Sequence, residues 1–271
     1  VKINRKIWSW ALYDWANSAF STTVVAGFFP IFFEKYWSNP NDVVQSTFQL
    51  GLANSVASII VAIVSPFLGA VADRGSARKK MLYTFAFLGI CATGSLCVLN
   101  QGEWKLAIFI YIFASIGFMC GNIFYDSLLP DISGKQKIDF VSSFGYALGY
   151  LGGGLLFLIN VLMYLNPGWF GIQDSAMAIK LSFLSVAIWW AIFSLPMFFL
   201  VPEQKVNNSV PLGKALRAGY IQLKDTFNSI RKMKTIGTFL LAYWLYIDGV
   251  DTIIKMAVKM GSSIGFETSD L

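Results

Sequence analysis

The stretch IWSWALYDWANSAFSTTVVAGFFPIFF, residues Ile7–Phe33, is apolar almost throughout and is long enough to cross a membrane as one helix. Polar side chains interrupt it at offsets of 0, 3, 4 and 7, namely Asp14, Asn17, Ser18 and Ser21. This spacing puts all four on one face of a helix. Because polar groups in hydrocarbon need partners, we expect that face to point into a bundle or a water-filled cavity. An ionisable residue at membrane depth makes Asp14 a candidate functional residue.

The composition predicts an all-α polytopic membrane protein. Of the 271 residues, 56% are hydrophobic and 13% are charged, whereas about 25% of residues in a soluble domain are charged. The net charge of +6 is expected to come from cytoplasmic loops, so no nucleic-acid partner is predicted. The chain has no histidine, and its other metal-ligating residues do not cluster. We therefore expect neither a metal site nor a cofactor.

The apolar runs predict membrane spans at about 7–33, 48–72, 81–99, 106–129, 140–165, 178–201 and 235–260. Most Lys and Arg residues fall in the N-terminal tail and in the loops at 73–80, 130–139 and 202–234. Positively charged loops mark the cytoplasmic side of a membrane. We therefore expect a monomeric, multi-pass protein of the bacterial inner membrane, embedded in the lipid bilayer, with its N-terminus in the cytoplasm.

The segment 202–234 differs from the other loops because it is long and basic. Apolar residues recur in it at near-helical spacing: Leu212, Leu216, Leu223, Phe227 and Ile230. This pattern predicts an amphipathic helix, which either lies on the cytoplasmic membrane surface or is tucked under the bundle as a connector. The predicted domains are therefore a six-helix bundle at 1–201, this linker at 202–234, and a third part at 235–271.

The seventh predicted span repeats the polar pattern of the first. When Asp248 is aligned with Asp14, the offsets 3, 4 and 7 carry Asp251, Thr252 and Lys255. Six spans, a basic loop and a seventh span that resembles the first are typical of a transporter built from two six-helix halves. We expect this chain to hold the first half and the opening helix of a truncated second half. The alternative is a chance likeness between two helices of a seven-helix protein.

The connection between the second and third predicted spans reads GAVADRGSARKK, residues 69–80. It resembles the loop signature of the major facilitator superfamily, although Ser76 and Ala77 depart from that pattern. The resemblance implies a cytoplasmic gate that latches two halves together, with the candidate residues Gly69, Asp73, Arg74 and Arg78. Arginines in such a latch need carboxylate partners, and Asp126 near the inner end of the fourth span is the candidate. The alternative is that the basic residues only determine topology.

Three further segments read YDWANSAF at Tyr13–Phe20, FYDSLLPD at Phe124–Asp131 and FGYALGYLGG at Phe144–Gly153. Together they resemble the branch of that superfamily that includes the yeast autophagy-related vacuolar amino-acid effluxer and its bacterial relatives. The resemblance implies a major facilitator-type bundle of twelve helices, alternating access and export of small solutes. Amino acids are the substrates associated with the eukaryotic members.

These patterns favour a secondary active transporter that exports a small polar solute, with amino acids as a candidate class and a proton or cation as a candidate coupling ion. The candidate solute or proton site comprises Asp14, Asn17, Ser18, Asn122, Tyr146, Tyr150, Asp248, Asp251 and Thr252. The carboxylates would attract an ammonium group or carry the proton, and the neutral side chains would supply hydrogen bonds. Lys255 follows Asp251 by four residues, so an ion pair within the helix can neutralise that carboxylate.

Other interpretations remain open. The polar stripe can serve packing between helices without any ligand, and the chain can be a non-transporting membrane receptor or scaffold on a transporter fold. An enzyme is disfavoured, since no histidine, Gly-x-Ser-x-Gly motif or cluster of metal ligands is present. The glycines of the fifth span favour tight packing over a moving hinge. They are Gly145, Gly149, Gly152, Gly153 and Gly154.

Overall fold

The computed structural model describes residues 3–74, 78–134, 137–202, 221, 224–225, 228–229 and 233–264. Every regular element in these ranges is a helix, which confirms the predicted all-α fold. The bounds are α1 Arg5–Ala19, η1 Phe20–Phe28, α2 Phe29–Phe32, η2 Phe33–Trp37, α3 Val43–Arg74, α4 Arg78–Ser95, η3 Leu96–Val98, α5 Trp104–Ser133, α6 Ile138–Leu165, η4 Pro167–Phe170, α7 Ser175–Leu200 and α9 Lys234–Ser263.

Within the described ranges, six segments are long and apolar enough to cross a membrane, and they confirm the first six predicted spans. They are Arg5–Trp37, Val43–Gly69, Arg78–Val98, Trp104–Ser133, Ile138–Leu165 and Ser175–Leu200. Each helix begins a few residues before its predicted span, and at two of them a polar side chain before the apolar run caps the first turn. Asn4 accepts a hydrogen bond from the Ile7 amide in this way, and Asp174 accepts one from the Met177 amide.

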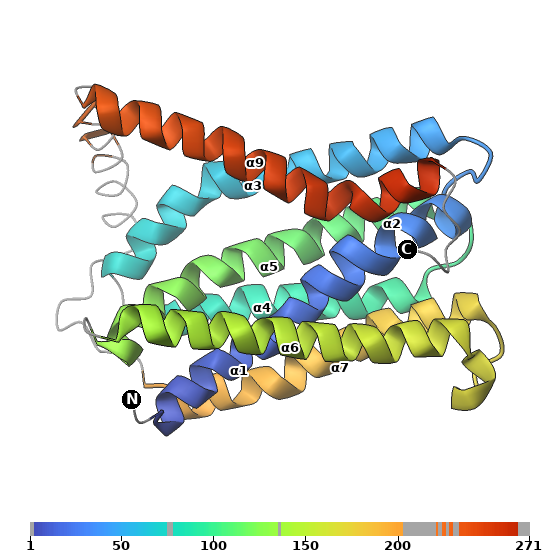
Figure 1. Cartoon of the computed structure of the whole chain (residues 1–271), viewed down its shortest axis with the longest axis horizontal. Helices are drawn as coiled ribbons and strands as arrows, with labels where there is room; N and C mark the ends of the chain where they lie inside the picture. The colour runs from blue at the N-terminus through green and yellow to red at the C-terminus, as the bar shows by residue number, and fades with distance from the viewer. Residues whose placement is uncertain are drawn as a thin grey trace.

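The spans run side by side along the long axis of the molecule (Figure 1). We call the end near the N-terminus the inner end, because the Lys and Arg distribution predicts that it is cytoplasmic, and the opposite end the outer end. The first span, from α1 to η2, lies at the centre. Its most apolar stretch is 72% buried inside the bundle, against 22–39% for the other five spans. Its polar residues therefore face protein more than lipid.

The first span is not a uniform α-helix, because η1 and η2 are π-helical. The first π-helical stretch, η1, starts at Phe20, within the polar stripe, and includes Ser21. There the hydroxyls of Ser21 and Thr22 both donate to the carbonyl oxygen of Ser18, at 2.9 and 3.1 Å. Side-chain bonds of this kind compete with the regular backbone ladder. Thr22 also donates to the Gly153 carbonyl at 3.2 Å, which ties this stretch to α6.

A row of glycines brings α6 close to α1. A Cβ atom at Gly152 would lie 2.5 Å from the carbonyl oxygen of Trp15, a distance that neither helix can accommodate without moving. Comparable close approaches occur at Gly145, Gly149 and Gly153. Gly154 differs, because no atom lies within 4 Å of its Cβ position. Four of the five glycines therefore serve the tight packing that the sequence predicts.

The seventh predicted span is present as α9, a single helix of 30 residues. Charged residues interrupt it, and it is not among the six segments that are apolar enough to span a membrane. It packs mainly against η1 and α2, and its C-terminal end lies beside α2 (Figure 1). The apolar positions of the predicted linker helix, from Leu212 to Ile230, lie outside the described residues.

Candidate functional site

Asp14 and Ser18 lie one turn apart on α1, on the side that faces α6. The Ser18 hydroxyl donates to Oδ1 of Asp14 across 3.2 Å. Gly149 makes room for both side chains, since a Cβ atom there would lie 2.7 Å from the Ser18 hydroxyl and 2.9 Å from Cγ of Asp14. No Lys or Arg among the described residues lies within ion-pair distance of Asp14. The carboxylate, half-buried in the bundle, therefore keeps the capacity to accept hydrogen bonds from a ligand.

Asn17, one turn from Asp14, already has a partner in the protein. Its Nδ2 donates to Oδ1 of Asn122 on α5 across 2.6 Å, and its side chain is only 1% exposed. The structure thus brings together two of the predicted site residues from different helices. The bond fixes α1 against α5 at the level of the candidate site.

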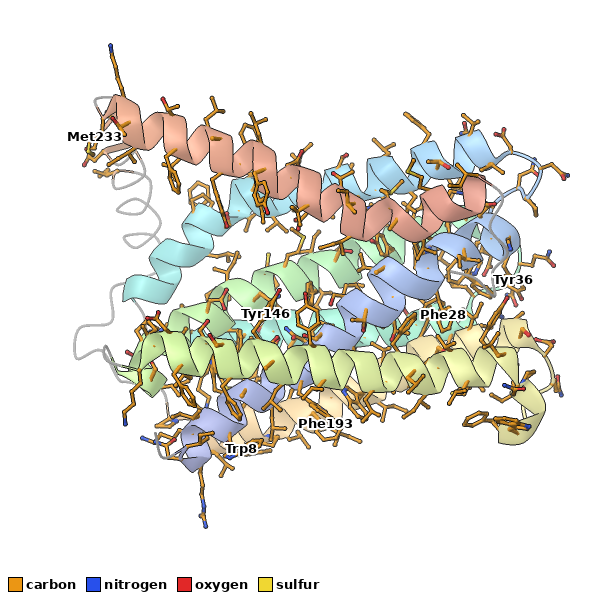
Figure 2. All side chains as sticks on the ribbon, in the orientation of Figure 1. Trp8, Phe28, Tyr36, Tyr146, Phe193 and Met233 are labelled. Atoms are coloured by element: carbon orange, nitrogen blue, oxygen red, sulfur yellow. The ribbon has the colours of Figure 1, made fainter. Side chains whose placement is uncertain are left out.

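Tyr146 and Tyr150 form a pair on α6, with hydroxyl oxygens 3.1 Å apart. Both side chains are 63% exposed. They lie on the helix face next to Gly149, the glycine against which Asp14 packs. Tyr146 projects from the middle of α6 on the side turned toward α5 and α9 (Figure 2). The pair can therefore offer hydroxyl groups to a ligand beside the Asp14 carboxylate.

The predicted second stripe lies on α9, where Asp248, Asp251 and Thr252 are all exposed. In the described part of the chain, no hydrogen bond or ion pair joins Asp248 or Thr252 to Asp14 or Ser18. The side chain of Lys255, the expected partner of Asp251, lies outside the described residues. Convergence of the two stripes on one solute therefore stays a prediction.

At the inner end, the structure corrects the expected partner of Arg78. The guanidinium of Arg78 pairs with Asp131 at 2.6 Å and donates to the carbonyl oxygen of Ser127 at 2.9 Å, whereas Asp126 was the predicted partner. Arg78 is the first residue of α4, and Asp131 lies in the last turn of the neighbouring α5. Asp126 is more than a turn deeper along α5, so it is not level with the start of α4.

Lys79 makes a second connection at the inner end. Its ammonium group donates to the carbonyl oxygens of Phe198 and Val201, at the C-terminus of α7. A cation at this position satisfies carbonyl groups that have no partner within the helix.

Three predicted gate residues remain besides Arg78 and Asp126. Gly69 lies in α3 with open space around its Cβ position. The side chains of Asp73 and Arg74 lie outside the described residues.

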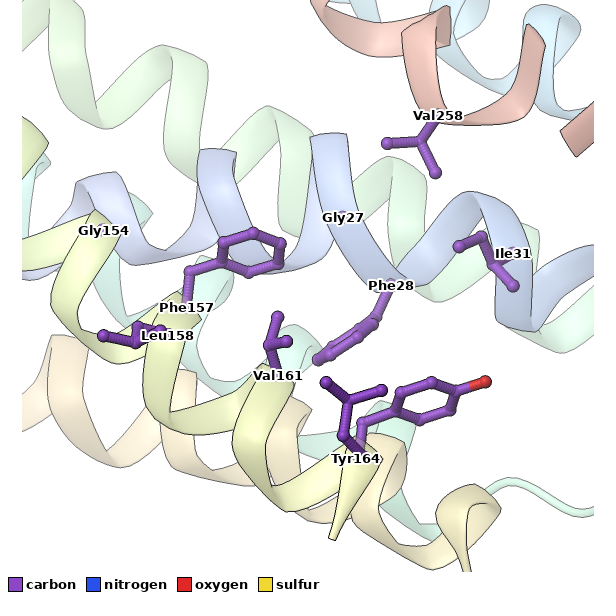
Figure 3. Close-up of a pocket in the computed structure, with 10 residues that line it drawn as sticks. Gly27, Phe28, Ile31, Gly154, Phe157, Leu158, Val161, Tyr164 and Val258 are labelled. Atoms are coloured by element: carbon purple, nitrogen blue, oxygen red, sulfur yellow. The ribbon is translucent and has the colours of Figure 1, made fainter. Parts of the chain in front are cut away.

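A cavity of about 420 Å³ opens between η1, α2, α6 and α9 (Figure 3). Its lining is apolar apart from one tyrosine hydroxyl, and it includes Phe28, Phe157, Val161 and Val258. None of the predicted polar site residues lines it. A polar solute would find no counter-charge in this cavity, so the candidate site remains the Asp14 group.

Comparison with known families gives a match over residues 41–271 to the family described as "Vacuole effluxer Atg22 like". The chain belongs to this Atg22-like family. The uncharacterized MFS-type transporter YxiO of Bacillus subtilis is 35% identical over 265 residues, which are 97% of this chain and 61% of YxiO. Autophagy-related protein 22 of Yarrowia lipolytica is 24% identical over 280 residues, which are 75% of this chain and 46% of that protein.

No solved structure matches the chain, and the chain spans about half to three fifths of the length of these relatives. The matches confirm the resemblance to the major facilitator superfamily and to its Atg22 branch. Together with the six apolar spans, they show that this Atg22-like chain is an integral, multi-pass membrane protein.

Sequence reasoning missed one ion pair in this Atg22-like chain. Lys259 on α9 donates to Oε2 of Glu34 in η2 and, at 3.1 Å, to the hydroxyl of Ser46 in α3. Glu34 lies just beyond the apolar run of the first span, and Lys259 lies near the end of the seventh predicted span. The one available signal was a glutamate and a lysine at the outer ends of two spans with similar polar patterns.

Proposed function

We propose that this protein is a secondary active transporter that exports a small polar solute bearing an ammonium group, by alternating access. The observation that carries the proposal is Asp14, a carboxylate in the central span that has a hydroxyl donor but no cation partner among the described residues. An unneutralised carboxylate at this depth is costly, and such residues commonly mark substrate or ion pathways. The names of the family and of its MFS-type relative support transport and efflux.

The surrounding residues have distinct proposed roles. Asp14 supplies the counter-charge for the ammonium group, with Ser18 orienting the carboxylate. Tyr146 and Tyr150 offer neutral hydrogen bonds from α6, and the bond from Asn17 to Asn122 holds α1 in place. Free amino acids are the proposed substrate class. On the other half, Asp248, Asp251 and Thr252 complete the site when the halves approach.

Two further parts of the proposal concern coupling and the inner gate. A proton or a cation that occupies Asp14 when the solute is absent would couple transport to an ion gradient. The pair of Arg78 and Asp131, with the motif residues Gly69, Asp73 and Arg74, would form the gate at the inner end. A non-transporting receptor or scaffold on this fold is the competing function. The family points to transport rather than to an enzyme.

The test is counterflow of radiolabelled amino acids into proteoliposomes that contain the full-length protein. Loss of a charge-assisted interaction weakens binding by about 1.5–3 kcal/mol, so Asp14→Asn should lower the initial rate by roughly tenfold or more. Asp139→Asn, the same change at an exposed position in the first turn of α6, is the matched control and should keep the rate. Equal rates for Asp14→Asn and wild type would refute the assignment, and saturable binding without accumulation would indicate a receptor.

A further inference from the structure

A buried ion pair joins the two halves at the outer end. Lys259 is 2% exposed and Glu34 is 6% exposed. They are separated by 225 residues in the sequence, so the contact depends entirely on how α9 lies against the first span. Ser46 completes the site: its hydroxyl donates to the Val43 carbonyl at 2.9 Å and accepts from Lys259. The ammonium group therefore has partners on both η2 and α3.

The π-helical turn η2 directs Glu34 into the bundle. Within η2, Phe33, Glu34 and Trp37 are the buried residues, so the carboxylate is on the same side as the aromatic core. Removing one member of a buried ion pair leaves an uncompensated charge and is strongly unfavourable, whereas replacing both costs far less. Glu34 and Lys259 are therefore stable inside the bundle only when they are paired with each other.

The burial of α9 is uneven along its length. Near its C-terminal end, Met256, Val258 and Lys259 are buried or half-buried, whereas the residues from Lys234 to Tyr246 are exposed almost throughout. In Figure 1 the C-terminal end of α9 lies beside α2, and its N-terminal end stands apart from α1 and α6. In this structure the two halves are therefore joined at the outer end and separate at the inner end.

We propose that Glu34, Lys259 and Ser46 form an outer gate, which is closed in this structure and must open before the solute site can face the outer side. The gate rests on the proposed alternating access. An outer gate explains why Glu34 and Lys259 are buried where the first span and α9 have to separate. Once water enters, each charged group can exchange its partner for hydration. An ion pair with a purely structural role would instead hold α9 against the first span in every conformation of the transport cycle.

The test measures how fast a cysteine behind the gate reacts in the full-length, detergent-purified protein, which needs neither a solute nor a membrane orientation. Ile31→Cys is the reporter, since Ile31 is buried on α2 and lines the cavity with Val258. It is placed in a background in which Cys91, Cys97 and Cys120 are serine. Glu34→Gln, which leaves the buried Lys259 ammonium group without its carboxylate, should raise the labelling rate by a polar maleimide at least fivefold.

The charge exchange Glu34→Lys with Lys259→Glu is the second variant and should bring labelling back to within twofold of the parent. The matched control is the inner ion pair: Arg78→Gln with Asp131→Asn should not increase labelling of Ile31→Cys. Unchanged labelling in a Glu34→Gln variant that remains monodisperse on gel filtration would overturn the gate, as would a charge exchange that labels as fast as Glu34→Gln. Because wild-type counterflow is measured separately, failure of the proposed function is distinguishable from failure of the gate.

Discussion

At the scale of single residues, Asp14 and Asn17 lie one turn apart but have different surroundings. Asn17 is fully buried and bonded to Asn122 at 2.6 Å, whereas Asp14 is half-buried with a hydroxyl donor at 3.2 Å. Hydrogen bonds between membrane helices contribute about 0.6 to 2 kcal/mol each. Asn17 therefore stabilises the bundle, and Asp14 is the residue with capacity left for a ligand.

This difference predicts a stability effect for the asparagine pair. Asn17→Leu should lower the free energy of unfolding by about 1–3 kcal/mol, because it leaves the Asn122 amide without a partner inside the bundle. Replacing both residues by Leu should cost clearly less than the sum of the two single changes, since no polar group is then left unpaired. Thermal unfolding in detergent, followed by gel filtration, measures this. Ser21→Ala is the control, because that hydroxyl bonds only within its own helix. Additive single changes would show that the two amides are not coupled.

The residues of the candidate site could be predicted only as far as local spacing reaches. Helical offsets placed Asp14 and Ser18 on one face, and the bond between them confirms that spacing. The partner of Arg78 could not be predicted correctly, because it depends on where α5 ends, and that helix continues past Pro130 to Ser133. The bond from Asn17 to Asn122 depends on the crossing of α1 and α5, which no local pattern encodes.

At the scale of elements, the contact between α1 and α6 determines where the candidate site lies. Glycines at 145, 149, 152 and 153 let the two helices approach until backbone and ring atoms touch, and the same approach sets Asp14 beside the face of Tyr146 and Tyr150. The apolar spans were predictable because length and hydrophobicity are local properties. The π-helical stretches were not, because no local hydrophobic pattern distinguishes them from α-helix; in η1 the Thr22 hydroxyl bonds to carbonyls of the same span and of α6.

The glycine row predicts a position-dependent effect of added side chains. Gly152→Val should destabilise the protein by about 1–3 kcal/mol through overpacking, because its Cβ would lie 2.5 Å from the Trp15 carbonyl oxygen. Gly154→Val is a matched control on the same helix, with open space at its Cβ position, and should change stability little. The yield of monodisperse protein and its thermal midpoint are the measurements. A similar loss for both variants would mean that helix propensity, rather than the α1–α6 contact, determines the cost.

At the scale of the whole molecule, two ion pairs lie at opposite ends of the bundle and join different sets of helices. The pair of Arg78 and Asp131 lies within the six-span bundle and joins α4 to α5. The pair of Glu34 and Lys259 joins that bundle to α9. The sequence could predict that α9 repeats the stripe of the first span, but not the side on which the two helices meet, because this depends on buried contacts far apart in the chain.

If the two stripes bind one solute, Asp14 and Asp248 should be energetically coupled although no contact joins them in this structure. Asp14→Asn and Asp248→Asn should each lower counterflow by roughly tenfold, and the double variant should lose markedly less than the roughly hundredfold expected for independent sites. The reason is that a solute bound by only one of these two side-chain carboxylates is already held weakly, so removing the other carboxylate costs less. The matched cycle pairs Asp14→Asn with Asp139→Asn, an exposed position on α6, where the effects should multiply. Multiplicative losses for Asp14 and Asp248 as well would place the two carboxylates in separate steps, and the repeat on α9 would then reflect a shared helix pattern rather than a shared solute site.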